Sequence, residues 1–311
     1  MKPSASISVA ITQYLDCRRK MGFAMKTEGR TLHSLGVYAR KVGHRGPLTK
    51  KIALQWVQLP ASANRLWWAR RLDMVRRFAR FWKNVQPATE VPPAGLFGPV
   101  CHRGPVHLYT PEETSTLLEA TDALAQPWRQ HTFRTLVGLL TCTGLRISEA
   151  LRLNGEDLNE SAGTLTVRRS KGGRSRCLPL HPSAVQALKA YQRLRGRRHP
   201  AASTDRLFLN LRGQPLTYSQ AAKTFRWLRR QLPRGNHRAP RWHDMRHSFA
   251  VDALLHWYRQ GHDVGPKLLA LATYLGHRNI KDTYWYLSAV PELLALSSGR
   301  LATLTKGGRH V

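Results

Sequence analysis

The chain has 311 residues, and its 50 Lys and Arg against 18 Asp and Glu give a formal net charge of +32. Such a charge repels itself unless a polyanion is present, so it indicates a nucleic-acid partner. The arginines are spread over every segment instead of forming one juxtamembrane cluster, and no apolar run approaches about 18 residues, which argues against a membrane protein.

The cysteines are four in number and lie far apart without a C-x-x-C pair: Cys17, Cys101, Cys142 and Cys177. Neither a zinc site nor a disulfide framework is indicated, so we expect no metal and no cofactor. A reducing cytosol is the simplest setting. Together with the charge, it predicts a cytoplasmic, nucleoid-associated protein.

Residues 1–86 are predicted to form a helical, DNA-binding domain. Apolar residues recur at helical spacing from Ile7 to Leu15, and shorter helices are expected over 31–42 and 49–59. A longer helix has an apolar face that we expect to be core: Trp67, Met74, Val75, Phe78, Phe81 and Trp82. Trp68 is left open between stacking on bases and packing. The opposite face carries Arg65, Arg70, Arg76, Arg77, Arg80 and Lys83, of which we expect Arg70, Arg76, Arg77 and Arg80 to contact DNA.

A segment dense in helix breakers follows, "VQPATEVPPAGLFGPVCHRGPVH", with five prolines and three glycines. Prolines and glycines at this density are typical of a linker. We therefore place the domain boundaries at 1–86, a linker at 87–107, and a second domain at 108–311.

The second domain is predicted to be helical around one hairpin. Thr110, Pro111 and Glu113 have the pattern of a capped helix start, and a buried helix ends at "TG", Thr143 and Gly144. A new helix is expected in "LRISEALRL". The helical spacing of apolar residues then stops in "GTLTVRRSKGGRSRCLPL", where two β-prone runs indicate two strands joined at Lys-Gly-Gly. Helices return in "HSFAVDALLHWYRQ" and "PKLLALATYLGH", so the fold class is mainly α with a small antiparallel β-sheet.

Cleaving a phosphodiester without a metal requires cations on the phosphate oxygens, a nucleophile and a proton donor for the leaving oxygen. In "HDMRH", His243 and Arg246 are three residues apart and point the same way at a helix start, and Arg146 follows a glycine break. Lys171 stands at the expected hairpin tip. Each motif alone has an ordinary explanation as a solvated side chain or a turn. An H-x-x-x-H metal pair lacks a third ligand, and the acidic cluster Glu156, Asp157 and Glu160 is predicted to be a solvated turn.

Four segments in order, "TGLRISEAL", "RSKGGRSRCLPL", "HDMRHSFA" and "LGHRNIKDTYWY", resemble the tyrosine recombinases, the phage-integrase-like site-specific DNA recombinases. The resemblance covers roughly the last two thirds of the chain, and residues 1–86 correspond more loosely to the family's core-binding domain. It implies the roles of the catalytic set: Arg146 and Arg246 as a phosphate clamp, Lys171 as leaving-group acid, His243 in proton transfer, His277 on the phosphate, and Tyr286 as nucleophile.

Two assignments leave an alternative open. The family's nucleophile usually stands nine residues after the histidine, which selects Tyr286, and Tyr284 two residues away would face elsewhere on a helix. Glu149 resembles the acidic residue that orients the cluster, but by its spacing it is equally a helix-surface acid that pairs with Arg146 or Arg152.

The resemblance also implies the reaction and its partners. The enzyme would cleave and rejoin DNA through a 3′-phosphotyrosyl intermediate without metal or ATP, with four protomers on two double-stranded DNA sites. The DNA backbone would be bound by arginines around the hairpin: Arg168, Arg169, Arg174 and Arg176. The tail "PELLALSSGRLATL" would dock on a neighbouring protomer or cap its own. The rival hypotheses are a type IB topoisomerase-like enzyme and a DNA-binding accessory protein that does not cut.

Overall fold

The computed structural model describes residues 6–100, 106–168, 175–233, 239–277, 279–289 and 292–295. The chain divides into two compact units, Met1–Gly104 and Pro105–Val311. None of the helices in these ranges is both long and apolar enough to cross a bilayer. The mainly helical fold with one small antiparallel sheet confirms the predicted fold class.

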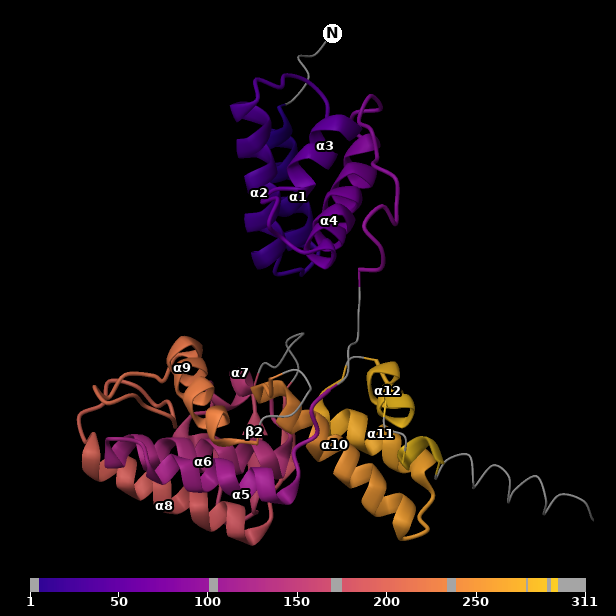
Figure 1. Cartoon of the computed structure of the whole chain (residues 1–311). Coiled ribbons are helices and arrows are strands. Elements are labelled where there is room, and N and C mark those ends of the chain that lie inside the picture. Colours follow the sequence, from indigo (N-terminus) through magenta and orange to yellow (C-terminus); the bar gives the residue numbers. More distant parts are fainter. Residues whose placement is uncertain are drawn as a thin grey trace, which may run out of the picture. The chain divides into compact units, whose positions relative to one another are not determined.

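The first unit is a bundle of four helices: α1 (Ile7–Lys20), α2 (Lys26–Lys41), α3 (Lys50–Val57) and α4 (Arg65–Lys83) (Figure 1). Its core gathers one face of each helix, including Ile11, Leu35, Trp56 and Phe78. The side chains of Ser6, Thr49 and Asn64 cap the starts of α1, α3 and α4 by accepting backbone N–H groups. These capping residues therefore determine where α1, α3 and α4 begin.

The buried face of α4 differs from the predicted one. Trp67 is 47% exposed, so its assignment to the core was wrong. In the first turn of α4 it is Trp68 that faces its neighbours: its indole N–H donates to the Pro60 carbonyl, and its ring packs edge-on against Phe97. The buried face also includes a charged residue, Arg71, whose guanidinium lies 3.8 Å over the Trp56 ring.

Part of the proline-rich segment packs against the first unit. Thr89 is buried, the Glu90 N–H donates to the Leu48 carbonyl at 2.9 Å, and Val91 and Phe97 pack against the core of the first unit. Arg76, half-buried on α4, donates to the Pro92 carbonyl. Residues up to about 97 therefore pack as part of the first unit.

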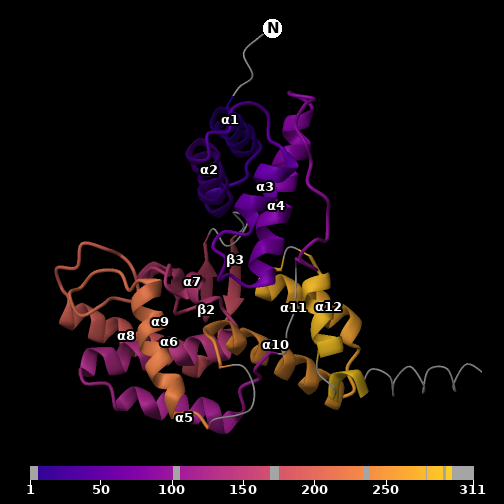
Figure 2. The same cartoon turned by 45° about the horizontal axis from the view of Figure 1, so that its top comes forward.

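The second unit is built on α6 (Pro127–Thr143), which packs against α5 (Pro111–Asp122), α8 (Pro182–Arg198) and α10 (Trp242–Arg259) (Figure 1). The predicted start of α5 is confirmed: Thr110 and Glu113 form both hydrogen bonds of a capping box. The predicted hairpin is also confirmed. Strands β2 (Thr164–Val167) and β3 (Arg176–Pro179) pair antiparallel (Figure 2). Strand β1 (Leu158–Asn159) pairs with the other edge of β2.

The helix expected in "LRISEALRL" is a single turn, α7 (Ile147–Ala150), and the acidic turn after it is not wholly solvated. Asp157 is 3% exposed, accepts the Asn154 N–H at 2.7 Å and pairs with Arg168. A short 3-10 turn, Gly155–Asp157, places this carboxylate inward, so the prediction of a solvated turn was wrong for Asp157.

The remaining helices are α9 (Tyr218–Leu228), α11 (Val264–Leu275) and α12 (Lys281–Ala289). The last two pack with α10 around a separate small core that includes Leu254, Leu271 and Tyr286. Leu293 of the tail is buried in the same core, and Glu292 pairs with Arg259. The start of the tail thus packs within its own chain, and residues 296–311 lie outside the described ranges.

Candidate active site

The guanidinium of Arg246 donates hydrogen bonds to carbonyl groups at the C-terminal ends of two helices. Gly144 ends α6 in the left-handed conformation, and its carbonyl accepts from Nη1 of Arg246 at 2.9 Å. The carbonyl of Leu275, at the end of α11, accepts from Nη2. Carbonyls at helix C-termini carry partial negative charge, which suits a buried cation. Burial and the neighbouring Arg146 lower the pKa of Arg246 to about 9, so it remains charged at neutral pH.

Glu149 organises a second group of cations. Its carboxylate is 1% exposed and accepts from Arg146 at 2.8 Å and from Arg176 at 2.9 and 3.2 Å. Burial alone would raise the pKa of Glu149, but hydrogen bonds and charges from Arg176 and Arg146 outweigh it and lower the pKa to about 2. Arg146 is the residue just before α7, and its Nη2 also donates to the Gly276 carbonyl at 3.4 Å.

Two histidines share the field of these arginines. Desolvation, then the charges of Arg246 and Arg146, lower the pKa values of both His243 and His277 to about 4, so both are neutral at pH 7. His277 follows the end of α11, and its Nδ1 lies 2.7 Å from Oγ1 of Thr283, which is fully buried. The cluster thus combines fixed cations with neutral imidazoles.

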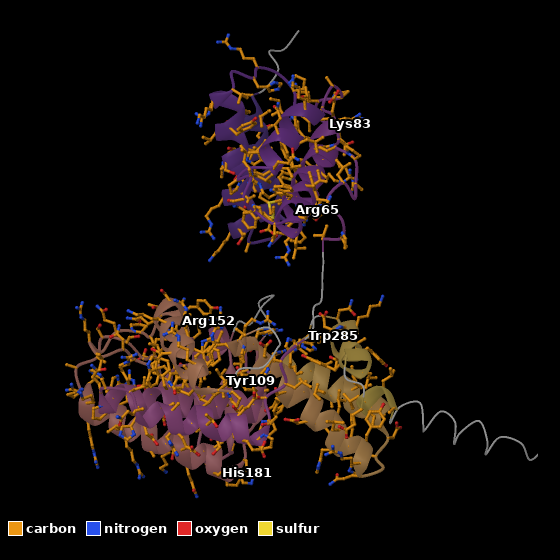
Figure 3. The ribbon with its side chains drawn as sticks, in the orientation of Figure 1. Arg65, Lys83, Tyr109, Arg152, His181 and Trp285 are labelled. Atoms are coloured by element: carbon orange, nitrogen blue, oxygen red, sulfur yellow. The ribbon has the colours of Figure 1, made fainter. Side chains whose placement is uncertain are left out.

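The two tyrosines of α12 have different surroundings. Tyr286 is 2% exposed, whereas Tyr284 is 48% exposed. The Tyr286 ring stacks with the His277 ring at a centroid distance of 6.4 Å, and its hydroxyl lies 2.9 Å from Nδ1 of His247. Trp285, between them in sequence, packs against His247 and is labelled in Figure 3. Of the two phenols, Tyr286 is the one that lies beside the arginines and imidazoles.

The structure brings together six of the seven residues predicted for catalysis and its support: Arg146, Glu149, His243, Arg246, His277 and Tyr286. Lys171 lies outside the described residues, as do Arg169 and Arg174. Glu149 pairs with Arg146, one of the two partners considered, but not with Arg152. Its other side-chain partner is Arg176, for which the sequence predicts a contact with DNA instead.

The described arginines that were predicted to contact DNA differ in exposure, and Arg76 is half-buried against Pro92. Arg70, Arg77 and Arg80 are exposed on α4, whose ends are marked by Arg65 and Lys83 in Figure 3. Arg168 pairs with Asp157 and Glu156 but is half exposed. Arg176 points inward, with a side chain 10% exposed and an Nε that donates to the Tyr274 carbonyl at 2.7 Å. Strand alternation would have placed it there, because Leu178, two residues on, is fully buried.

We expect Gly144→Ala to destabilise the fold. Its φ of +59° disfavours any residue with a Cβ by about 1–2 kcal/mol, and the added carbon would lie 2.6 Å from the Phe249 ring. Gly163→Ala is the matched control, since its φ is +61° but the nearest atom would be 3.9 Å away. Chemical denaturation should show a clearly larger loss for position 144. Equal losses of stability would show that the close contact between Gly144 and Phe249 contributes nothing beyond the cost of the positive φ.

Comparisons with known proteins show the family to which this chain belongs. The phage integrase family matches residues 108–292. The protein y4rB of Sinorhizobium fredii, named as an integrase/recombinase, is 37% identical over 94% of this chain and 96% of its own. The tyrosine recombinase XerC of Roseiflexus sp. is 31% identical over 70% of this chain and 66% of its own.

A solved structure has the same fold. It is the integrase of transposon Tn1549 in complex with transposon right end DNA, with a TM-score of 0.71, 18% identity and coverage of 96% of this chain and 100% of the other. The family match spans the elements that carry Arg146, Arg246 and Tyr286. This chain therefore belongs to the phage integrase family and is a tyrosine-type site-specific DNA recombinase.

Proposed function

We propose that Tyr286 is the nucleophile of this recombinase and that it forms a 3′-phosphotyrosyl link with release of a 5′ hydroxyl. The observation that carries the proposal is that Tyr286, only 2% exposed, lies in the same cluster as Arg146, Arg246, His243 and His277. Resealing reverses the step when the 5′ hydroxyl of a partner strand attacks the link. The bond energy is kept in the ester, so ATP is not required.

The arginines supply the electrostatics of the step. Guanidinium groups match the oxygens of a phosphate, and Arg146 and Arg246 are both held by backbone carbonyls before any phosphate arrives. Such preorganised donors stabilise the charge that develops on the phosphorane and take the place of a metal ion. His243 would assist proton transfer, and His277 would hydrogen-bond the phosphate as a neutral imidazole. We assign protonation of the leaving 5′ oxygen to Lys171.

The partner is double-stranded DNA, and the related integrase of transposon Tn1549 was solved with transposon end DNA. We propose four protomers on two DNA sites, because exchange needs two strands cut and rejoined in each duplex. The exposed arginines of α4 would add backbone contacts from the first unit. A chain with a net charge of +32 that acts on chromosomal DNA would be found at the nucleoid.

The test is covalent trapping on nicked suicide duplexes tiled across the DNA that flanks the coding sequence. Cleavage beside the nick releases a short fragment, so the reaction stops at the covalent stage. We expect a denaturation-resistant protein–DNA adduct in the presence of EDTA. Binding without any adduct would indicate an accessory protein, and a strict need for magnesium would contradict the mechanism. Efficient relaxation of a plasmid that lacks the trapped site would favour a topoisomerase.

The salt dependence of binding tests the role of α4. Arg80 is exposed, so Arg80→Ala should leave stability nearly unchanged while the slope of log affinity against log salt becomes shallower by about 0.9, the value for one phosphate contact. Fluorescence anisotropy across a salt series measures the slope. Glu119→Gln on α5 is an exposed control that should not change it. An unchanged slope for Arg80→Ala would remove this residue from the interface.

A further inference from the structure

His247 is a polar group of this cluster for which the proposed function has no role. It lies one turn after His243 on α10, half-buried, with its Nδ1 2.9 Å from the hydroxyl of Tyr286. When an imidazole carries its proton on Nε2, its Nδ1 accepts a hydrogen bond, and the phenol is then the donor. The ring is fixed from two sides by edge-on contacts with His243 at 4.6 Å and Trp285 at 5.6 Å.

Attack by the tyrosine requires an acceptor for its proton. A phenol with an ordinary pKa of about 10 is almost entirely protonated at neutral pH. The guanidinium groups of Arg146 and Arg246 stabilise a phenolate, but they are themselves protonated and cannot accept. His277 presents its ring face to Tyr286 and directs its Nδ1 to Thr283. His243, which is assigned to assist proton transfer, contacts the His247 ring edge-on at 4.6 Å. His247 itself places a ring nitrogen 2.9 Å from the reacting oxygen.

Resting on the proposed function, we propose that Nδ1 of His247 receives the hydroxyl proton of Tyr286 as the phenol attacks the scissile phosphate. The O–H bond breaks as the bond from the tyrosine oxygen to phosphorus forms, and the bond from phosphorus to the 5′ oxygen breaks. The 5′ oxygen takes its proton from the leaving-group acid. In resealing, the His247 imidazolium returns its proton to the departing tyrosine oxygen.

The surroundings of His247 suit this role. Burial, and then the neighbouring His243, lower the pKa of His247 to about 3, so the ring is neutral before DNA binds. Asp244 opposes this shift, while Arg241 and Arg246 add to it. A bound phosphate brings negative charge beside the ring and favours its protonated form. The acceptor therefore gains basicity when the substrate is in place.

The proposal is tested with His247→Asn in single-turnover cleavage of the trapped duplex. The Asn amide oxygen can accept the hydrogen bond of the phenol, but it cannot take the proton. We expect cleavage to slow by about a hundredfold to ten-thousandfold. His256→Asn, an exposed histidine on the same helix, is the matched control and should cleave at the wild-type rate.

A substrate with sulfur in place of the bridging 5′ oxygen separates the two proton transfers. Sulfur leaves without a proton, so this substrate should rescue a variant that lacks the leaving-group acid, such as Lys171→Ala, but not His247→Asn. Rescue of His247→Asn by sulfur would overturn the proposal. A His247→Asn rate within threefold of wild type on the oxygen substrate would also overturn it.

A more acidic phenol gives an independent readout that does not depend on the stability of the variant. With a multiply fluorinated tyrosine at position 286, the phenol is far more acidic and needs less help from a base, so the defect of His247→Asn should shrink at least tenfold. An undiminished defect would show that His247 acts only in the fold. Tyr286→Phe keeps the two hypotheses apart. If its adduct persists, the proposed nucleophile is wrong, whereas full loss of adduct beside normal cleavage by His247→Asn removes only the role of His247.

Discussion

Tyr286→Phe is expected to abolish the covalent protein–DNA adduct, while Tyr284→Phe forms it at the wild-type rate. The substitution removes only the hydroxyl, and the ring keeps its place beside His277 in the core of α10, α11 and α12. Losing the hydrogen bond to His247 costs about 1 kcal/mol of stability, which is too little to unfold the unit. DNA binding should therefore persist in both variants.

The measurement is denaturing gel electrophoresis of the trapped duplex, with binding followed in parallel by anisotropy. Tyr284 is the natural control because it lies on the same helix but is 48% exposed. An adduct that survives Tyr286→Phe and disappears in Tyr284→Phe would move the nucleophile by two residues. It would also require α12 to turn, since residues two apart on a helix point about 200° apart.

Glu149→Gln should destabilise the second unit and slow cleavage. The change leaves Arg146 and Arg176 without their shared carboxylate, and breaking a buried ion pair typically costs about 3–5 kcal/mol. With Arg146 displaced from its position, cleavage should slow on the order of a hundredfold, as expected for misplaced catalytic groups. Chemical denaturation and single-turnover cleavage measure the two effects. Glu119→Gln, an exposed acid on α5, should show neither.

The stability of Glu149→Gln relative to wild type should depend on pH. The folded pKa of Glu149, about 2, is below its ordinary value of 4.5, so the carboxylate stabilises the fold fully above pH 4.5, by about 3 kcal/mol. This stabilisation is lost as the pH falls from 4.5 towards 2. The difference between the two proteins should therefore shrink over that range. A difference that stays constant from pH 6 to pH 3 would mean that ion pairing is not the cause.

Local patterns predicted much of this fold because local physics determines those features. The capping box at Thr110, the break at Gly144 and the change of period into the hairpin each depend on neighbouring residues, and each appears in the structure. The catalytic set was named from four ordered motifs. The alternation of strand side chains also predicts an inward Arg176, whereas its charge alone suggests an exposed residue, and in the structure the strand periodicity prevails because Glu149 neutralises the guanidinium.

Features that depend on distant partners were not predictable. Trp67 and Trp68 are both compatible with the face of a helix, and the choice between them is made by Pro60 and Phe97, which the fold brings to the first turn of α4. His247 was considered only as half of a metal pair, because its spacing from His243 shows nothing of a tyrosine 39 residues later. The burial of Arg71 likewise depends on Trp56, a residue of another helix whose ring lies 3.8 Å from the guanidinium.

The two helix-end carbonyls that hold Arg246 have a practical consequence for the engineering of this recombinase. Because the carbonyls that end α6 and α11 both accept from one side chain, removing it also leaves these two buried groups without that donor, so a loss of activity would be mixed with a loss of stability. Inert versions for crystallisation with intact DNA are better made at the phenol. Selections for new target sites should keep Arg246 fixed and vary exposed positions instead.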